Sequence, residues 1–119
     1  MNDAKRACVA MACGLLKNRG RSYSTVYDYK RAKYCLFGVN QSGRNTVSVF
    51  DYDRRAFFQG TVPNFFDYAT SSHVQLREEG NFMSGYDFQN SQFFSVTFND
   101  NIVSIYDYDF SAFFHYSII

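Results

Sequence analysis

The sequence predicts a mainly β protein in which an antiparallel, up-and-down meander of about ten strands curls around one N-terminal α-helix. Three observations predict it: one helix-like segment at the start, a hairpin-length repeat through the rest, and an aromatic content of 20% from 14 Phe and 10 Tyr. A chain of 119 residues has the length of one domain. We therefore assign residues 1–119 to a single domain, with the helix at 3–18 and the hairpin repeats at 22–118.

The first element is the predicted helix over residues 3–18. Asn2 or Asp3 can cap its start, and Gly20 suits a left-handed stop beyond its end. Apolar residues recur with helical spacing at positions 8, 11, 12 and 15, and nearly all of them are small. Because small side chains let a neighbouring surface come close, we expect this helix to be a plug on which an aromatic sheet packs.

The apolar run of this helix also bears on the compartment. Its length suits the central region of a signal peptide and is too short to span a bilayer. Asp3 in the leading segment and basic residues directly after the run favour a helix that is retained. The odd number of cysteines does not fit a secreted disulfide framework. We expect a cytoplasmic protein without a membrane contact, whose three cysteines are small buried hydrophobes: Cys8, Cys13 and Cys35.

An internal repeat organises the remainder of the chain. Residues 47–58 (VSVFDYDRRAFF) and residues 103–114 (VSIYDYDFSAFF) are identical at eight of twelve positions. Residues 26–37, 65–76 and 85–96 are weaker copies that share an aromatic-Asp-aromatic centre. The aspartates at the five centres are Asp28, Asp51, Asp67, Asp87 and Asp107.

Each repeat has the pattern of a β-hairpin. Alternation places Phe50 and Tyr52 on one face of a strand, and Val49 and Asp51 on the other. A short polar segment follows, and an aromatic pair then opens a second strand. A carboxylate beside a turn can accept the backbone N–H groups of that turn, so we assign the five aspartates as structural turn caps. The ten predicted strands cover residues 22–29, 32–39, 45–52, 56–62, 64–69, 72–78, 81–88, 92–98, 101–108 and 112–118.

Two closures of this meander remain open at this point. The strands can form a closed barrel around the helix, which removes the edges of the sheet. Alternatively, they form a strongly bent sheet with the helix on its concave side, and an exposed edge or face then needs a partner.

The sequence predicts no catalytic, cofactor-binding or metal-binding residues, and so no enzyme. It contains neither an H-x-x-x-H nor a C-x-x-C motif for zinc, and no Gly-rich phosphate loop. Equivalent aspartates of neighbouring hairpins are expected about 10 Å apart, too far to share a small ion. Cys35 lies within a predicted strand, where a core role is the better interpretation.

Aromatic residues that follow the aspartates form the candidate interaction surface. They recur on one face together with Ser and Thr, a composition typical of a partly solvent-exposed surface. Either this face is core with hydroxyls at its rim, or it is an exposed platform for a protein partner, a second copy, or stacked sugars or bases. The residues are Tyr29, Tyr52, Tyr68, Phe88 and Tyr108.

Charge is divided unevenly along the chain. Residues 1–44 hold nine basic and two acidic residues, whereas residues 45–119 hold three basic and nine acidic ones. The two halves can face each other in the fold, or they can form a dipole that steers association. Nucleic acid could bind the basic end through its phosphates, although the acidic remainder opposes this. The candidate basic patch consists of Lys17, Arg19, Arg21, Lys30, Arg31 and Lys33.

The leading functional hypothesis is a non-enzymatic binding or assembly module that presents a Tyr-rich sheet surface and self-associates. The excess of aromatic residues motivates it. Aromatic side chains recur both before and after the five aspartates, and together they exceed what one short helix can cover. One alternative is a barrel that carries a small apolar ligand. Another is a small inhibitor or effector that acts on a nucleic-acid-handling partner.

Overall fold

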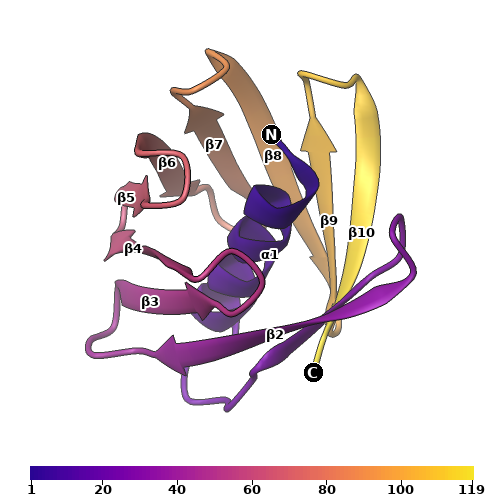
Figure 1. Cartoon of the computed structure of the whole chain (residues 1–119). Helices are drawn as coiled ribbons and strands as arrows, with labels where there is room; N and C mark the ends of the chain where they lie inside the picture. Colours follow the sequence, from indigo (N-terminus) through magenta and orange to yellow (C-terminus); the bar gives the residue numbers. More distant parts are fainter.

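The computed structural model describes all 119 residues and shows a β-barrel closed around a helix (Figure 1). Helix α1 (Asp3–Lys17) runs along the inside of the ring of strands. The side chain of Asn2 accepts a hydrogen bond from the backbone N–H of Lys5 at the start of α1, and the N–H of Asn18 donates to the carbonyl of Gly14 at its end. The helix ends one residue before the predicted boundary.

Ten antiparallel strands form the wall, and each pairs with its neighbours in the sequence. The meander closes where β1 pairs with β10, with Val26 opposite Ile118. The predicted fold class is confirmed, and the closed barrel is the closure that forms. The strands are β1 (Thr25–Asp28), β2 (Lys33–Asn40), β3 (Thr46–Asp51), β4 (Ala56–Thr61), β5 (Asn64–Asp67), β6 (Ser72–Glu78), β7 (Met83–Asp87), β8 (Gln92–Asn99), β9 (Ile102–Asp107) and β10 (Ala112–Ile118).

The five hairpins share one turn geometry. Each first strand ends at an aspartate of the repeat, and four residues connect it to the second strand. The last of these four has a positive φ between 51° and 55° in every hairpin. None of the five is a glycine: they are Ala32, Arg55, Ser71, Ser91 and Ser111.

This shared conformation leads to a stability prediction. An L-residue in the left-handed region costs about 1–2 kcal/mol, which glycine avoids at a smaller entropic cost. We expect Ser91→Gly to raise the free energy of unfolding by about 0.5–1 kcal/mol in urea denaturation. Ser95→Gly, within β8, is the matched control and should lower it by about as much. A loss of stability in Ser91→Gly would contradict the argument.

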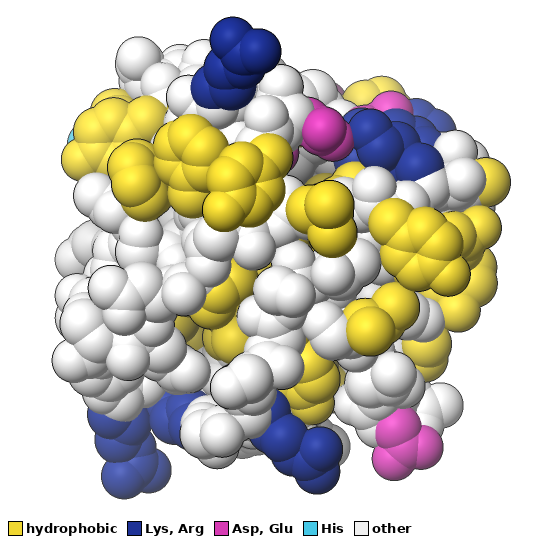
Figure 2. Space-filling view, turned by 60° about the horizontal axis from the view of Figure 1, so that its bottom comes forward, with side chains coloured by type: hydrophobic (Ala, Val, Ile, Leu, Met, Phe, Trp, Pro, Cys, Tyr) yellow, Lys and Arg dark blue, Asp and Glu magenta, His cyan; other side chains and the backbone are white.

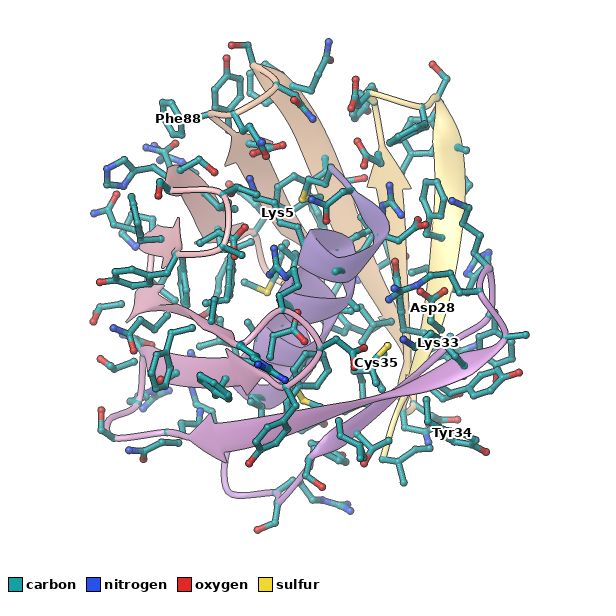
Figure 3. The ribbon with its side chains drawn as sticks, viewed as in Figure 1. Lys5, Asp28, Lys33, Tyr34, Cys35 and Phe88 are labelled. Carbon is teal, nitrogen blue, oxygen red and sulfur yellow. The ribbon has the colours of Figure 1, made fainter.

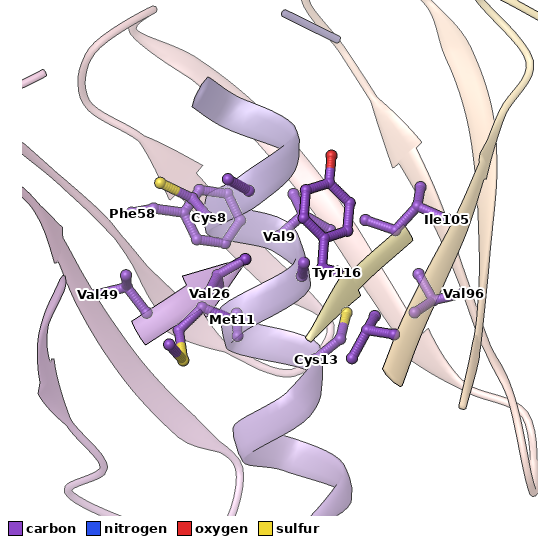
Figure 4. Close-up of a cluster of buried hydrophobic side chains, with 14 of the residues drawn as sticks. Cys8, Val9, Met11, Cys13, Val26, Val49, Phe58, Val96, Ile105 and Tyr116 are labelled. Carbon is purple, nitrogen blue, oxygen red and sulfur yellow. The ribbon is translucent and has the colours of Figure 1, made fainter. Parts of the chain in front are cut away.

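The core lies between α1 and the inner face of the barrel (Figure 4). Residues from Lys5 to Leu16 are all buried, on every side of the helix, because the wall surrounds it completely. Each hairpin directs one cross-strand pair inward, two residues before its aspartate and seven after it. These pairs are Val26–Cys35, Val49–Phe58, Phe65–Val74, Gly85–Phe94 and Ile105–Phe114.

The structure settles two details of the packing that the sequence left open. Helical spacing marks one apolar face of the helix, and the structure buries its whole circumference from Lys5 to Leu16. The aromatic face could be core or exposed, and it lies outside: Phe50 is only half-buried there, while Val47 and Val49 are fully buried within. The reason is that a helix of small residues leaves a narrow annulus, which branched aliphatic side chains and a few inward phenylalanines fill.

Candidate functional site

The five repeat aspartates form a ring inside the barrel, at the end where the hairpin turns lie. We call them the carboxylate ring; each of the five is at most 3% exposed. Asp51 Oδ1 accepts hydrogen bonds from the backbone N–H groups of Asp53 (3.0 Å) and Arg54 (3.4 Å). Asp28, Asp87 and Asp107 accept from the turn N–H two residues on, whereas Asp67 accepts from the Thr70 hydroxyl.

Cations compensate this ring from two directions. From α1, Lys5 Nζ lies 2.6 Å from Asp87 Oδ1, and Arg6 Nε lies 3.2 Å from Asp107 Oδ2. The amino group of Met1 lies 2.9 Å from the same oxygen of Asp107. Lys5 and Arg6 are themselves fully buried, which only paired charges tolerate.

The other cations come from the hairpin turns. Arg31 pairs with Asp28. Arg54 bridges two carboxylates, with Nε 2.7 Å from Asp51 Oδ2 and Nη2 2.9 Å from Asp67 Oδ1. Ion pairs therefore tie the turns to one another and the wall to the helix. No group of three or more His, Cys, Asp or Glu side chains is arranged to hold a metal ion.

The protonation states follow from burial and these partners. Burial acts to lower the pKa of Arg54, but its hydrogen bonds and charge contacts with Asp67 and Asp51 outweigh this and raise its pKa. Burial raises the pKa of the Cys8 thiol in spite of the nearby Arg54. Burial likewise raises the pKa of Tyr116, in spite of Arg6. At neutral pH, Arg54 is thus a fixed cation, and Cys8 is a neutral thiol rather than a nucleophilic thiolate.

The outside of the same end carries the second feature, which we call the aromatic girdle. Each hairpin contributes three rings: the residue before its aspartate, the residue after it, and the residue six positions after it. The triplets are Tyr27/Tyr29/Tyr34, Phe50/Tyr52/Phe57, Phe66/Tyr68/His73, Tyr86/Phe88/Phe93 and Tyr106/Tyr108/Phe113.

The girdle repeats one packing arrangement. Within every triplet the first ring contacts the other two edge-to-face, with centroids 4.8–5.4 Å apart. The first ring is half-buried, and the nine Tyr and Phe rings at the other two positions are 45–64% exposed. Figure 3 shows Tyr34 and Phe88 projecting away from the barrel, whereas Lys5 and Cys35 lie inside it. In Figure 2 the hydrophobic side chains gather in separate groups on the surface.

All five residues of the predicted interaction surface belong to this girdle, as the second ring of each triplet. Sequence reasoning missed the third ring, for example Phe57 and Phe93, which is exposed as well. The aromatic pair that opens the second strand of most hairpins could have indicated this third ring. Strand pairing sets its first member beside the ring before the aspartate, as in Phe50 opposite Phe57, while Phe58 turns inward.

The structure does not bring the predicted basic patch together. Lys17, Arg19 and Arg21 lie at the end of α1 that is remote from the carboxylate ring. Lys30 contacts Asp3 at the opposite end, and Arg31 and Lys33 pair with Asp28 and Asp53 there. Fifteen helical residues separate the two groups, a length of about 22 Å.

The two unevenly charged parts of the chain face each other. Basic residues before position 45 pair with acidic residues after it, as in Lys5–Asp87, Arg6–Asp107 and Arg19–Glu78. The acidic part therefore forms no separate negative surface. The interior also offers no room for the predicted alternative of a carried apolar ligand, because α1 occupies it.

Comparison with known proteins adds no family. No protein-family model, curated protein or solved structure matches this chain. The one helix, α1, is not long and apolar enough to cross a membrane.

Proposed function

We propose that this protein is a non-enzymatic binding and assembly module, and that its aromatic girdle contacts a second copy of the chain. The observation that carries the proposal is the exposure of nine Tyr and Phe rings, each 45–64% accessible, on one end of the barrel. Aromatic side chains are enriched at protein interfaces, and here they recur at equivalent positions of all five hairpins.

The polar parts of the girdle support the same proposal. The hydroxyl of Tyr29 is used within the chain, 2.8 Å from Ser117 Oγ. The hydroxyls of Tyr52 and Tyr108 make no such bond, so they are free to bond across an interface. Because the triplets recur around a closed barrel, several similar contacts can act together, which raises overall affinity.

The proposal also includes a reducing compartment, the cytoplasm. Its support is that Cys8, Cys13 and Cys35 are unpaired thiols. Disulfides are rare where thiols are kept reduced.

Size-exclusion chromatography with light scattering tests the assembly. We expect the wild-type mass to rise above that of a monomer as concentration increases. The double variant Tyr52→Ser/Tyr108→Ser should weaken self-association at least about tenfold, because two partly desolvated aromatic contacts are lost. Its circular dichroism should be unchanged, since both rings lie outside the core.

Ile119→Ser is the matched control, because it removes an apolar side chain of similar exposure, 53%, that belongs to no triplet. It should leave the mass distribution as in the wild type. A wild-type protein that stays monomeric up to the highest soluble concentration would refute assembly through the girdle. An unfolded double variant would show that these rings stabilise the fold.

A further inference from the structure

A polar hollow opens at the end of the barrel remote from the girdle, between the segment after α1 and the loop that joins β2 to β3. It has a volume of about 600 Å³. Two of its lining residues are arginines, and none is acidic or hydrophobic: Arg19, Gly20, Gln41, Gly43 and Arg44. We call this site the arginine hollow; it is open to solvent.

One of the two arginines is held in place. Arg19 Nε donates to the carbonyl of Arg44 (2.6 Å), and its Nη2 donates to Asn45 Oδ1 (2.9 Å) and Glu78 Oε1 (2.6 Å). These bonds leave Nη1 of Arg19 without a partner in the chain. A guanidinium fixed in this way loses little conformational entropy when it binds an anion.

The other arginine supplies unpaired charge. The side chain of Arg44 is exposed and makes neither an ion pair nor a hydrogen bond. Glu78 neutralises Arg19, so the unpaired charge of Arg44 gives the lining its net positive charge.

The glycines leave the wall of the hollow bare. A Cβ at Gly20 would meet nothing within 4 Å, and at Gly43 it would meet only Thr46; the φ of 89° at Gly20 favours glycine there, whereas no contact requires Gly43. Without side chains, the backbone at both positions is open to a ligand. The lining therefore combines guanidinium donors and accessible backbone, the elements that bind oxyanions.

We propose that the arginine hollow binds a phosphoryl group. Phosphate oxygens match the planar fork of a guanidinium, and the lining offers two of these groups, the anchored Arg19 and the unpaired Arg44. This site is distinct from the girdle and does not depend on it. The group could come from a small phosphorylated molecule or from a nucleic-acid backbone, and both sources share this chemistry.

Chemical-shift titration of the ¹⁵N-labelled protein tests the proposal with two probes, sodium pyrophosphate and a short single-stranded oligothymidylate. We expect saturable shifts of the Gly20 and Gly43 amide signals. Arg44→Gln should weaken binding at least about tenfold, because it removes a charge-assisted hydrogen bond. The affinity of Arg44→Lys should lie between those of the wild type and Arg44→Gln, since lysine keeps the charge but lacks the planar pair of N–H donors.

Arg55→Gln is the matched control, because Arg55 is an exposed arginine without an ion pair at the opposite end. It should leave pyrophosphate binding unchanged. Saturable pyrophosphate binding with no tighter binding of the oligonucleotide assigns a small phosphorylated ligand. Tighter, steeply salt-dependent oligonucleotide binding assigns a nucleic-acid backbone. Unsaturable shifts with both probes, or an equal loss in Arg55→Gln, would overturn the site.

Discussion

Arg54→Ala is expected to lower the free energy of unfolding by about 3–5 kcal/mol, the usual cost of removing one partner from a buried ion pair. The side chain of Arg54 is 14% exposed and lies between Asp51 and Asp67, whose side chains are 4% and 0% exposed. Its removal leaves two carboxylates inside the barrel without a cation, and burial then penalises their charged forms. Urea denaturation followed by circular dichroism measures the effect.

The neighbouring residue offers the control. Arg55 is exposed and forms no ion pair, so Arg55→Ala should change the free energy of unfolding by no more than about 0.5 kcal/mol. Adding Asp67→Asn to Arg54→Ala should recover about 1 kcal/mol or more, because one uncompensated charge disappears. Equal effects of Arg54→Ala and Arg55→Ala would show that ion pairs do not hold the carboxylate ring.

The repeat made the hairpins predictable, because similar local sequences form similar turns. Nine of the ten predicted strands overlap the observed ones closely, and the first, predicted from residue 22, begins only at Thr25. The left-handed residue of each turn was not predictable from residue type. Ala, Arg and Ser occupy it, where glycine or asparagine would have marked it.

The direction of each strand face could not be predicted from alternation alone. Period two puts Phe50 and Tyr52 together and Val49 with Asp51, but it does not say which set faces inward. The helix decides this, because Lys5 and Arg6 at its start need buried carboxylates. Those pairings join residues far apart in sequence, 82 positions for Lys5 and Asp87, and no local pattern reports them.

The same limit applies to the candidate site. The second ring of each aromatic triplet followed from the repeat, and its exposure followed only from the direction of the strand face. The arginine hollow depends on the position of the β2–β3 loop beside the end of α1, which the closure of the barrel determines. Sequence reasoning grouped Arg19 with Lys30 instead, although opposite ends of the helix separate them.

Gly85→Ala is expected to lower the free energy of unfolding by about 2–3 kcal/mol, which is typical of overpacking a well-filled core. Gly85 lies opposite Phe94 in the inward pair of the fourth hairpin, and a Cβ there would clash with the Cζ, Cε1 and Cε2 atoms of the Phe94 ring. Phe94 is 1% exposed, so its ring has no free space to move into. Ordinary strand propensity favours alanine over glycine, so a loss of stability reports the steric conflict alone.

A double-mutant cycle separates this conflict from a general effect of glycine replacement. Phe94→Leu alone should lower stability by leaving a cavity, but combined with Gly85→Ala it makes room for the new methyl group. The coupling energy between the two changes should be about 1–3 kcal/mol in the stabilising direction. Gly43→Ala is the control, because its Cβ would meet only Thr46 at 3.7 Å or more, and its effect should be small. Simple additivity of Gly85→Ala and Phe94→Leu would mean that the ring does not require the glycine. Strong coupling would show that the fourth hairpin fits the helix because a phenylalanine covers the position of a missing side chain.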